Sequence, residues 1–225
     1  MAGISTGDML WDVALCVGIL LGVVVAWYVV FAQLNRRRSV RILGWIQSAF
    51  SGHGSITGME WLSPSHMLVR LRLRDCDFLH PRVHVKLTAR HWPNMWLLSR
   101  FRRTEETLTF EANLPYLPHS NLEVHNRAWR IRKRRARLPK KVTECRSLGP
   151  FVISSRYDWQ HEITRMMNAF VASRECEFQS VSLCRTAPHF VATVSLKAFA
   201  MHAASDSSIF EVLRALAQNA SAARF

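Results

Sequence analysis

One short stretch of the sequence gathers side chains that are able to bind a metal ion. Its five candidate ligands are Asp75, Cys76, Asp77, His80 and His84. Two histidines four residues apart share one face of a helix and can then bind the same zinc ion. Here, however, Pro81 and the alternation of apolar and basic residues in 82–90 predict the start of a strand, which holds the two imidazoles too far apart. We therefore interpret the stretch as a polar turn between strands and predict no metal site.

The motifs of hydrolytic and nucleotide-binding enzymes are incomplete in this chain. His161 and Glu162 begin an HExxH zinc-protease pattern, but Arg165 occupies the position of its second histidine. The glycines of residues 52–58 do not form a GxGxxG or GK[ST] phosphate loop, and no GxSxG occurs. We therefore predict a non-enzymatic protein with no catalytic residues and no cofactor.

The remaining reactive side chains are interpreted as structural. Glu105, Glu106 and Glu111 are candidates for a paired acid and base, but their charged and polar neighbours predict surface positions. The cysteines beyond residue 140 lack CxxC spacing, and in a reducing compartment such cysteines are more often buried than reactive.

Basic side chains are the strongest chemical signal in the chain. The 30 Lys and Arg residues outnumber the 16 Asp and Glu residues and give a net charge of +14, and ten of the basic residues fall in 127–146. Arginine binds phosphate through two parallel hydrogen bonds, so this excess predicts an anionic partner. The candidate contacts lie at three places along the chain: Arg36, Arg37 and Arg38; Arg70, Arg72, Arg74 and Lys86; and Arg132, Lys133, Arg134 and Arg135.

Two kinds of phosphate fit these residues. Anionic lipid headgroups are the nearest phosphates for a membrane-anchored chain, and each basic residue near such a surface gains about 1 kcal/mol. Nucleic acid or the ribosome is the alternative partner, but Trp129 is the only aromatic residue within the basic block, and no RNA-binding or helix-turn-helix signature is present. We therefore expect lipid contact by a membrane-bound adaptor or accessory subunit.

An apolar segment predicts that the chain is anchored in a membrane. Residues 13–34 are 22 consecutive residues without a charge, which span about 33 Å as a helix. Trp11 lies at one end of the segment, whereas Trp27 lies rather deep in it. A cleaved signal peptide is the competing interpretation, but the first 12 residues lack a basic region and the apolar run is too long.

The charges that flank the segment predict its orientation. Asp8 and Asp12 precede it without any basic residue, whereas Arg36–Arg38 and Arg41 follow it. Basic flanks stay in the cytoplasm, so we predict an outside N-terminus and a cytoplasmic C-terminal domain. The alternative is an envelope assembly subunit whose domain lies outside the cytoplasm.

Small residues recur every four positions within the segment. They are Ala14, Gly18, Gly22 and Ala26. Such a stripe permits close contact between membrane helices and predicts pairing with a second copy or another membrane subunit.

Residue periodicity predicts the elements of the remaining chain. An amphipathic helix is expected at 39–50, ended by Gly52 and Gly54, and another begins at the Ser208-x-x-Glu211 capping box. A further helix is expected from Asp158. Strands are expected at 56–62, 66–74, 82–90, 95–101, 107–112, 121–125, 150–155, 178–184 and 189–196.

These elements predict an α+β fold: a single N-terminal transmembrane helix and then a mainly antiparallel sheet with helices on one side. An overlay of the two hairpins at an offset of 123 residues matches His66 with His189 and raises the hypothesis of two αββ-type halves. The predicted segments are an extracytoplasmic N-terminus (1–12), a transmembrane helix (13–34), a juxtamembrane basic segment and amphipathic helix (35–55), a first β-rich half (56–126), a basic segment (127–149) and a second half (150–225).

Overall fold

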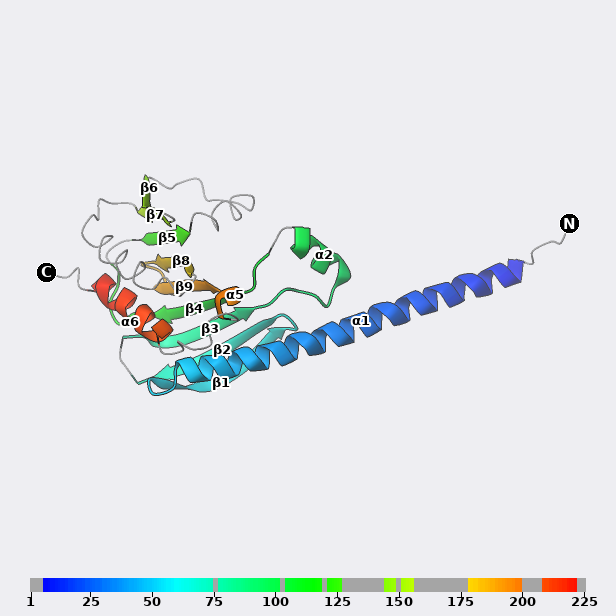
Figure 1. Cartoon of the computed structure of the whole chain (residues 1–225), viewed down its shortest axis with the longest axis horizontal. Helices are drawn as coiled ribbons and strands as arrows, with labels where there is room; N and C mark the ends of the chain where they lie inside the picture. The colour runs from blue at the N-terminus through cyan, green and yellow to red at the C-terminus, as the bar shows by residue number, and fades with distance from the viewer. Residues whose placement is uncertain are drawn as a thin grey trace.

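An unbroken helix, α1 (Thr6–Ala49), carries the apolar segment and continues past it into the folded domain (Figure 1). The computed structural model describes residues 6–74, 77–101, 104–118, 121–126, 144–148, 151–155, 178–199 and 208–221. Helix α1 is long and apolar enough to cross a membrane, and its most apolar stretch is not buried in the protein. This finding supports a membrane protein. The separate helix predicted at 39–50 is wrong as a separate element, because it is the last part of α1.

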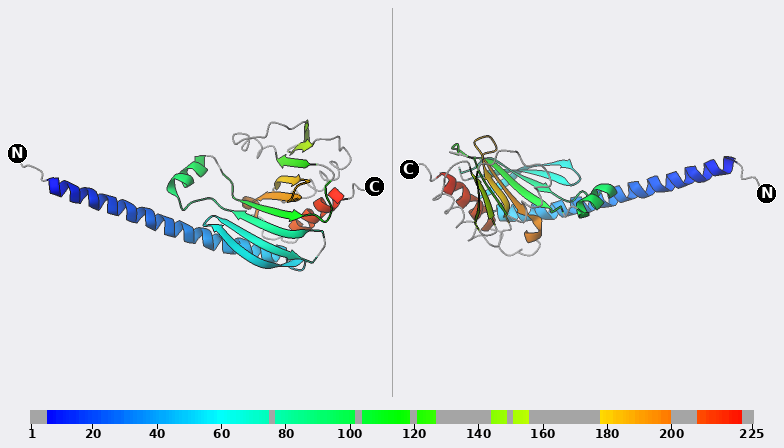
Figure 2. Two further views of the ribbon diagram at one scale, coloured as in Figure 1. Left: turned by 180° about the vertical axis from the view of Figure 1, so that it is seen from behind. Right: turned by 90° about the horizontal axis from the view of Figure 1, so that it is seen from above.

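The rest of the described chain is organised around one antiparallel sheet of nine strands (Figure 2). Their order across the sheet is β1-β2-β3-β4-β9-β8-β5-β7-β6. The strands are β1 (Gly54–Ser63), β2 (His66–Leu73), β3 (Leu79–Lys86), β4 (Thr107–Asn113), β5 (Leu122–Asn126), β6 (Glu144–Leu148), β7 (Phe151–Ser155), β8 (Phe178–Leu183) and β9 (Phe190–Ser195). The shorter helices are α2 (Pro93–Phe101), α5 (Leu196–Phe199) and α6 (Ser208–Ser221).

The hydrophobic core lies between one face of the sheet and the helices α1 and α6. Alternate residues of β2, β3 and β4 are buried, as the period of two in their sequences predicts, with Leu68 of β2 as an additional buried residue. Phe110 of β4 stands at the centre, with its ring 6.1 Å from that of Phe50 and 5.2 Å from that of Phe78. Ile46 of α1 and Leu213 of α6 belong to the same cluster. The last turns of α1 are therefore part of the core.

The two predicted hairpins are confirmed. Strands β1 and β2 pair around the turn at Ser63-Pro64-Ser65, and β8 and β9 pair around Thr186-Ala187-Pro188. The α+β class is also confirmed, but the two αββ halves are not. Strand β5 comes from the predicted first half, yet it lies between β8 and β7 of the second.

Three other predictions need correction or lie outside the described residues. The strand predicted at 95–101 is wrong, because Pro93 opens helix α2 there. Of the basic segment predicted at 127–149, only residues 144–148 are described, and they form strand β6, which pairs with β7. The helix predicted from Asp158 lies outside the described residues.

Candidate membrane-proximal site

Helix α1 is held to the domain by the connection between β3 and β4, residues 87–106, which contains α2. The indole Nε1 of Trp27 donates a hydrogen bond to the carbonyl oxygen of Arg90 at 3.0 Å. The amide Nδ2 of Asn35 donates one to the carbonyl oxygen of Thr88 at 3.2 Å, and Asn35 is buried. Both acceptors lie beyond the end of β3. The carbonyl of Thr88 also accepts a hydrogen bond from the backbone N–H of Arg90 at 2.8 Å, so Asn35 adds a second bond to it.

A buried carboxylate completes this attachment. Glu106 is 8% exposed, and its Oε2 lies 2.9 Å from Nη2 of Arg38. Its Oε1 lies 3.5 Å from Nη2 of Arg90 and accepts a hydrogen bond from the backbone N–H of Thr88 at 3.5 Å. The surface position predicted for Glu106 is therefore wrong. Its neighbours in the sequence are polar, but its partner is supplied by a distant turn of α1.

Aromatic rings surround α1 where it leaves the apolar segment. Trp27 packs edge-on against Trp96 of α2, with their centroids 6.0 Å apart. Tyr28 meets the ring of His91 at 5.7 Å and that of Trp92 at 6.0 Å. The β3–β4 connection therefore touches α1 inside the segment 13–34 that the sequence assigns to the membrane.

The structure separates the predicted anion contacts into different surfaces. Arg36 lies over the ring of Trp61 at 5.9 Å, Arg37 is exposed, and Arg38 is paired with Glu106. The side chains of Arg70, Arg72 and Lys86 alternate with core residues and therefore lie on the open face of the sheet, with Arg74 just beyond β2. Arg70 is paired there with Glu60 at 2.8 Å. Arg132, Lys133, Arg134 and Arg135 lie outside the described residues.

The small residues of α1 face no other part of the described chain. Ala14, Gly18, Gly22 and Ala26 are all exposed. A Cβ atom added at Gly18 or Gly22 would meet nothing within 4 Å. Packing within the described chain therefore does not require glycine at either position.

A cavity of about 450 Å³ is lined by α2, by the parts of the β3–β4 connection on either side of α2, and by Lys197 of α5. Three of its lining residues are basic: Arg90, Arg100 and Lys197. Ser99 and Thr104 also line it, and Glu105 supplies a carboxylate 3.5 Å from Nζ of Lys197. Trp96 belongs to the lining and also packs on Trp27, so the cavity lies beside the end of the apolar segment. Its excess of basic groups and hydroxyl donors suits an anionic group such as a phosphate.

A second polar cluster crosses three strands on the open face of the sheet. Nε2 of His66 lies 3.2 Å from Nδ1 of His84, and Nε2 of His84 lies 3.4 Å from Oε2 of Glu111. Burial lowers the pKa of His66, as do the neighbouring His84 and Lys86, while Glu111 opposes the shift. The sequence shows that these residues share a face by their alternation with core residues, but only the strand register brings them together.

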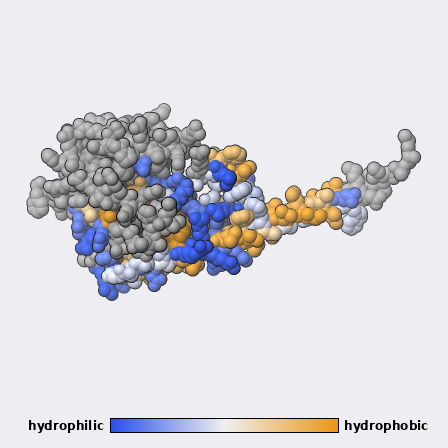
Figure 3. All heavy atoms as spheres, viewed as in Figure 1, coloured by the Kyte–Doolittle hydropathy of each residue, from blue (hydrophilic) through white to orange (hydrophobic). Residues whose placement is uncertain are grey.

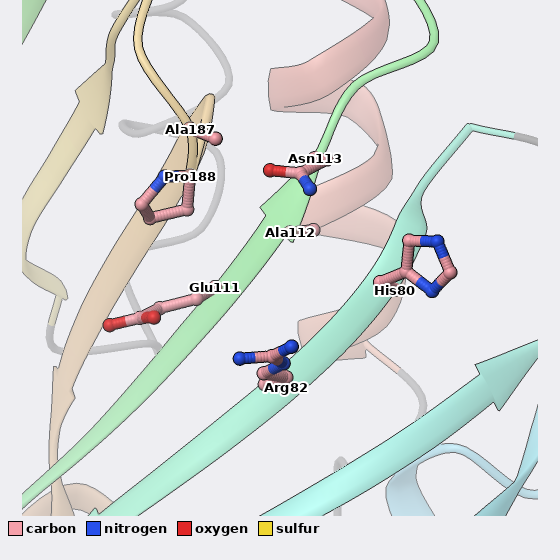
Figure 4. A pocket seen from close by; sticks show the side chains of 7 residues that line it. All are labelled: His80, Arg82, Glu111, Ala112, Asn113, Ala187 and Pro188. Carbon is pink, nitrogen blue, oxygen red and sulfur yellow. The ribbon is translucent and has the colours of Figure 1, made fainter.

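The candidate metal ligands do not converge in the described part of the chain. There, no group of three His, Cys, Asp or Glu side chains is placed to hold an ion. His80, Arg82 and Glu111 instead line a separate cavity of about 280 Å³ together with Asn113 and Pro188. Figure 4 shows that they come from β3, β4 and the β8–β9 turn. Asp75 and Cys76 lie outside the described residues.

No protein-family model matches the chain, and a search of the curated proteins finds no match. Function is therefore inferred from contacts within the molecule. The contacts between α1 and the β3–β4 connection are the ones that bear on it most directly.

Replacement of Glu106 by glutamine tests the attachment of α1. We expect Glu106→Gln to destabilise the protein by about 1–3 kcal/mol, because Arg38 and Arg90 both lose the negative charge of the buried Glu106 side chain. Thermal unfolding of the full chain in detergent measures the change. The matched control is Glu60→Gln, whose exposed pair with Arg70 should contribute about 0–1 kcal/mol. Equal losses in both variants would contradict the assigned role of Glu106.

Acidification tests the His66 cluster. The pKa of His66 is lowered in the folded protein, so below pH 6.5 the unfolded chain binds the proton more tightly than the folded protein does. The neutral His66 therefore leaves the stability of the fold intact above pH 6.5, and the fold loses stability as the pH falls below that value. We expect the unfolding temperature of His66→Gln to fall less between pH 7.5 and 5.5 than that of the native chain. Parallel pH curves would show that His66 titrates normally. His84→Gln is a useful companion, since it removes one cause of the shift.

Proposed function

We propose that the protein is a non-enzymatic, single-pass membrane protein whose basic α+β domain lies on the cytoplasmic face of the membrane. There it acts as an adaptor or accessory subunit of a membrane-associated complex and contacts anionic lipid headgroups. The observation that carries this proposal is the continuity of α1, which is at once the candidate membrane span and a wall of the domain core.

This continuity supports an adaptor role for a physical reason. A flexible linker would let a domain explore many heights and orientations, whereas α1 has no loop between its apolar part and Ile46 in the core. The hydrogen bonds of Trp27 and Asn35 and the Arg38–Glu106 pair reinforce the connection. A domain held in this way presents the same surface to neighbouring subunits at a fixed distance from the bilayer. A second copy or another subunit would pair with α1 along Gly18 and Gly22.

The lipid contact is supported by the basic groups at the membrane-proximal end. Arg36 and Arg37 follow the apolar segment directly, and Arg100 lines the cavity beneath α2. The open-face arginines Arg72 and Arg74 belong to the opposite end, because Arg74 is hydrogen-bonded to His53 beyond the C-terminus of α1. We therefore assign the headgroup contact to the first group and not to the second.

Reporter fusions test the orientation. A phosphatase that is active only outside the cytoplasm and a fluorescent protein that matures only inside it are fused in turn after Phe225. We expect fluorescence without phosphatase activity, because Arg36, Arg37 and Arg41 retain their flank in the cytoplasm. The reverse pattern would instead favour an envelope subunit with its domain outside.

Charge removal tests the lipid contact. The full chain is extracted into polymer-bounded nanodiscs, and the fraction of anionic lipid around it is compared with that of the bulk membrane. We expect Arg36→Gln, Arg37→Gln and Arg100→Gln in combination to abolish most of the enrichment, since each charge contributes about 1 kcal/mol near an anionic surface. The control combines Arg72→Gln, Arg74→Gln and Arg82→Gln, which remove the same charge from the exposed sheet. Equal loss in both triple variants would refute the assignment to the membrane-proximal end.

A further inference from the structure

Helix α2 exposes an apolar surface that the described chain leaves uncovered. None of its residues is buried. The exposed apolar side chains in and next to it are Trp92, Met95, Leu97, Leu98 and Phe101, of which Phe101 is 79% exposed. Figure 3 shows hydrophobic residues gathered at this place, close to the apolar part of α1.

Water is a poor environment for such a helix. Nine residues are too few for an isolated helix to be stable in water, and most helical stability in proteins comes from packing an apolar face. Helix α2 stands away from the sheet (Figure 1), and the aromatic contact that Trp96 makes is with Trp27 of α1. The remaining apolar side chains therefore need another medium in which to be buried.

The position of α2 along α1 identifies that medium. Trp96 and Trp92 touch Trp27 and Tyr28, two residues of the apolar segment, and the carbonyl of Arg90 accepts the indole hydrogen bond of Trp27. Residues 11–26 of α1 are exposed, so the apolar surface of α2 continues the surface of α1 that would face lipid. A bilayer that contains α1 up to Trp27 therefore reaches α2 as well.

We propose that α2 is an interfacial membrane helix that lies at the boundary between headgroups and acyl chains, in the cytoplasmic leaflet of the bilayer that α1 crosses. This inference rests on the proposed function in that α1 must span the membrane. The residue types agree with the location: tryptophan favours the interface, and the exposed Arg100 can extend from the apolar surface toward phosphate groups.

The proposal also explains the depth of Trp27 in the apolar segment. With α2 at the interface, Trp11 and Tyr28 mark the two membrane surfaces, about 26 Å apart along the helix axis at ~1.5 Å per residue. That distance is near the lower end of bilayer hydrocarbon thickness. Phe31 and Ala32, which are half-buried, then belong to the domain interface and not to the lipid-embedded part.

Spin labels on the full chain test the location of α2. The native cysteines are replaced by serine, and single labels are placed through Leu98→Cys, Phe101→Cys, Leu20→Cys and Leu117→Cys in vesicles of phosphatidylcholine and phosphatidylglycerol. Leu20 reports on α1. Leu117 is a 62% exposed apolar residue after β4, next to Tyr116, which donates a hydrogen bond to the carbonyl oxygen of Ala217 in α6. Accessibility to oxygen, which concentrates in lipid, is compared with accessibility to a water-soluble nickel chelate.

We expect the labels at Leu98, Phe101 and Leu20 to favour oxygen over nickel several-fold and the label at Leu117 to favour nickel. Nickel access at Leu98 and Phe101 with Leu20 still in lipid would overturn the inference alone. Exclusion of both reagents at Leu98 and Phe101 would overturn it too, since a protein partner or second copy would then cover α2. Nickel access at Leu20 would overturn the membrane span and with it the proposed function.

A second measurement keeps the native cysteines. Brominated lipids quench the fluorescence of tryptophan in or near the acyl chains. We expect Trp92→Phe to lower the quenched fraction of the total emission and Trp45→Phe, on the domain side of α1, to leave it unchanged or raise it. An unchanged quenched fraction in Trp92→Phe would place α2 outside the bilayer.

Discussion

The attachment of α1 to the β3–β4 connection is the constraint on which the rest of the structure depends. Glu106 supplies a buried negative charge beside two guanidinium groups, and Asn35 and Trp27 donate hydrogen bonds to backbone carbonyls just after β3. A buried charge pair contributes little net stability, but it strongly disfavours arrangements that leave the charge unpaired. Glu106 therefore favours one rotation of α1 about its axis and one position of α1 along that axis relative to the sheet.

The fold was largely predictable where the sequence has a strict period of two. Val69 and Leu71 alternate with Arg70 and Arg72, and this pattern predicts a strand with one buried and one solvent-exposed face. The run from Trp92 to Phe101 has no such period, because tryptophan and leucine suit a strand as well as a helix in a short apolar run. The opening Pro93 was the available signal for α2. The continuity of α1 also had a signal, since no proline interrupts residues 13–49.

The candidate site was less predictable because its partners are far apart in the chain. The sequence around Glu106 shows polar residues and nothing of Arg38, which reaches it from another element. The same holds for His66, His84 and Glu111, whose contacts depend on the register of three strands. The local sequence pattern indicates which face of a strand a residue occupies, whereas the contacts between residues of different elements depend on the topology of the fold. The sequence located basic residues next to the apolar segment and on β2 and β3, but it did not show that Arg74 lies at the end of the sheet beyond the C-terminus of α1.

An unbroken helix of 44 residues is about 66 Å long and can carry a change of tilt from one end to the other. Bilayers of different thickness change the tilt of the helices that cross them. Because Ile46 and Phe50 are packed in the core, any change in the tilt of α1 turns the sheet through the same angle. In the proposed arrangement, with α1 crossing the bilayer, the orientation of the open sheet face relative to the membrane plane would therefore depend on the thickness of the bilayer.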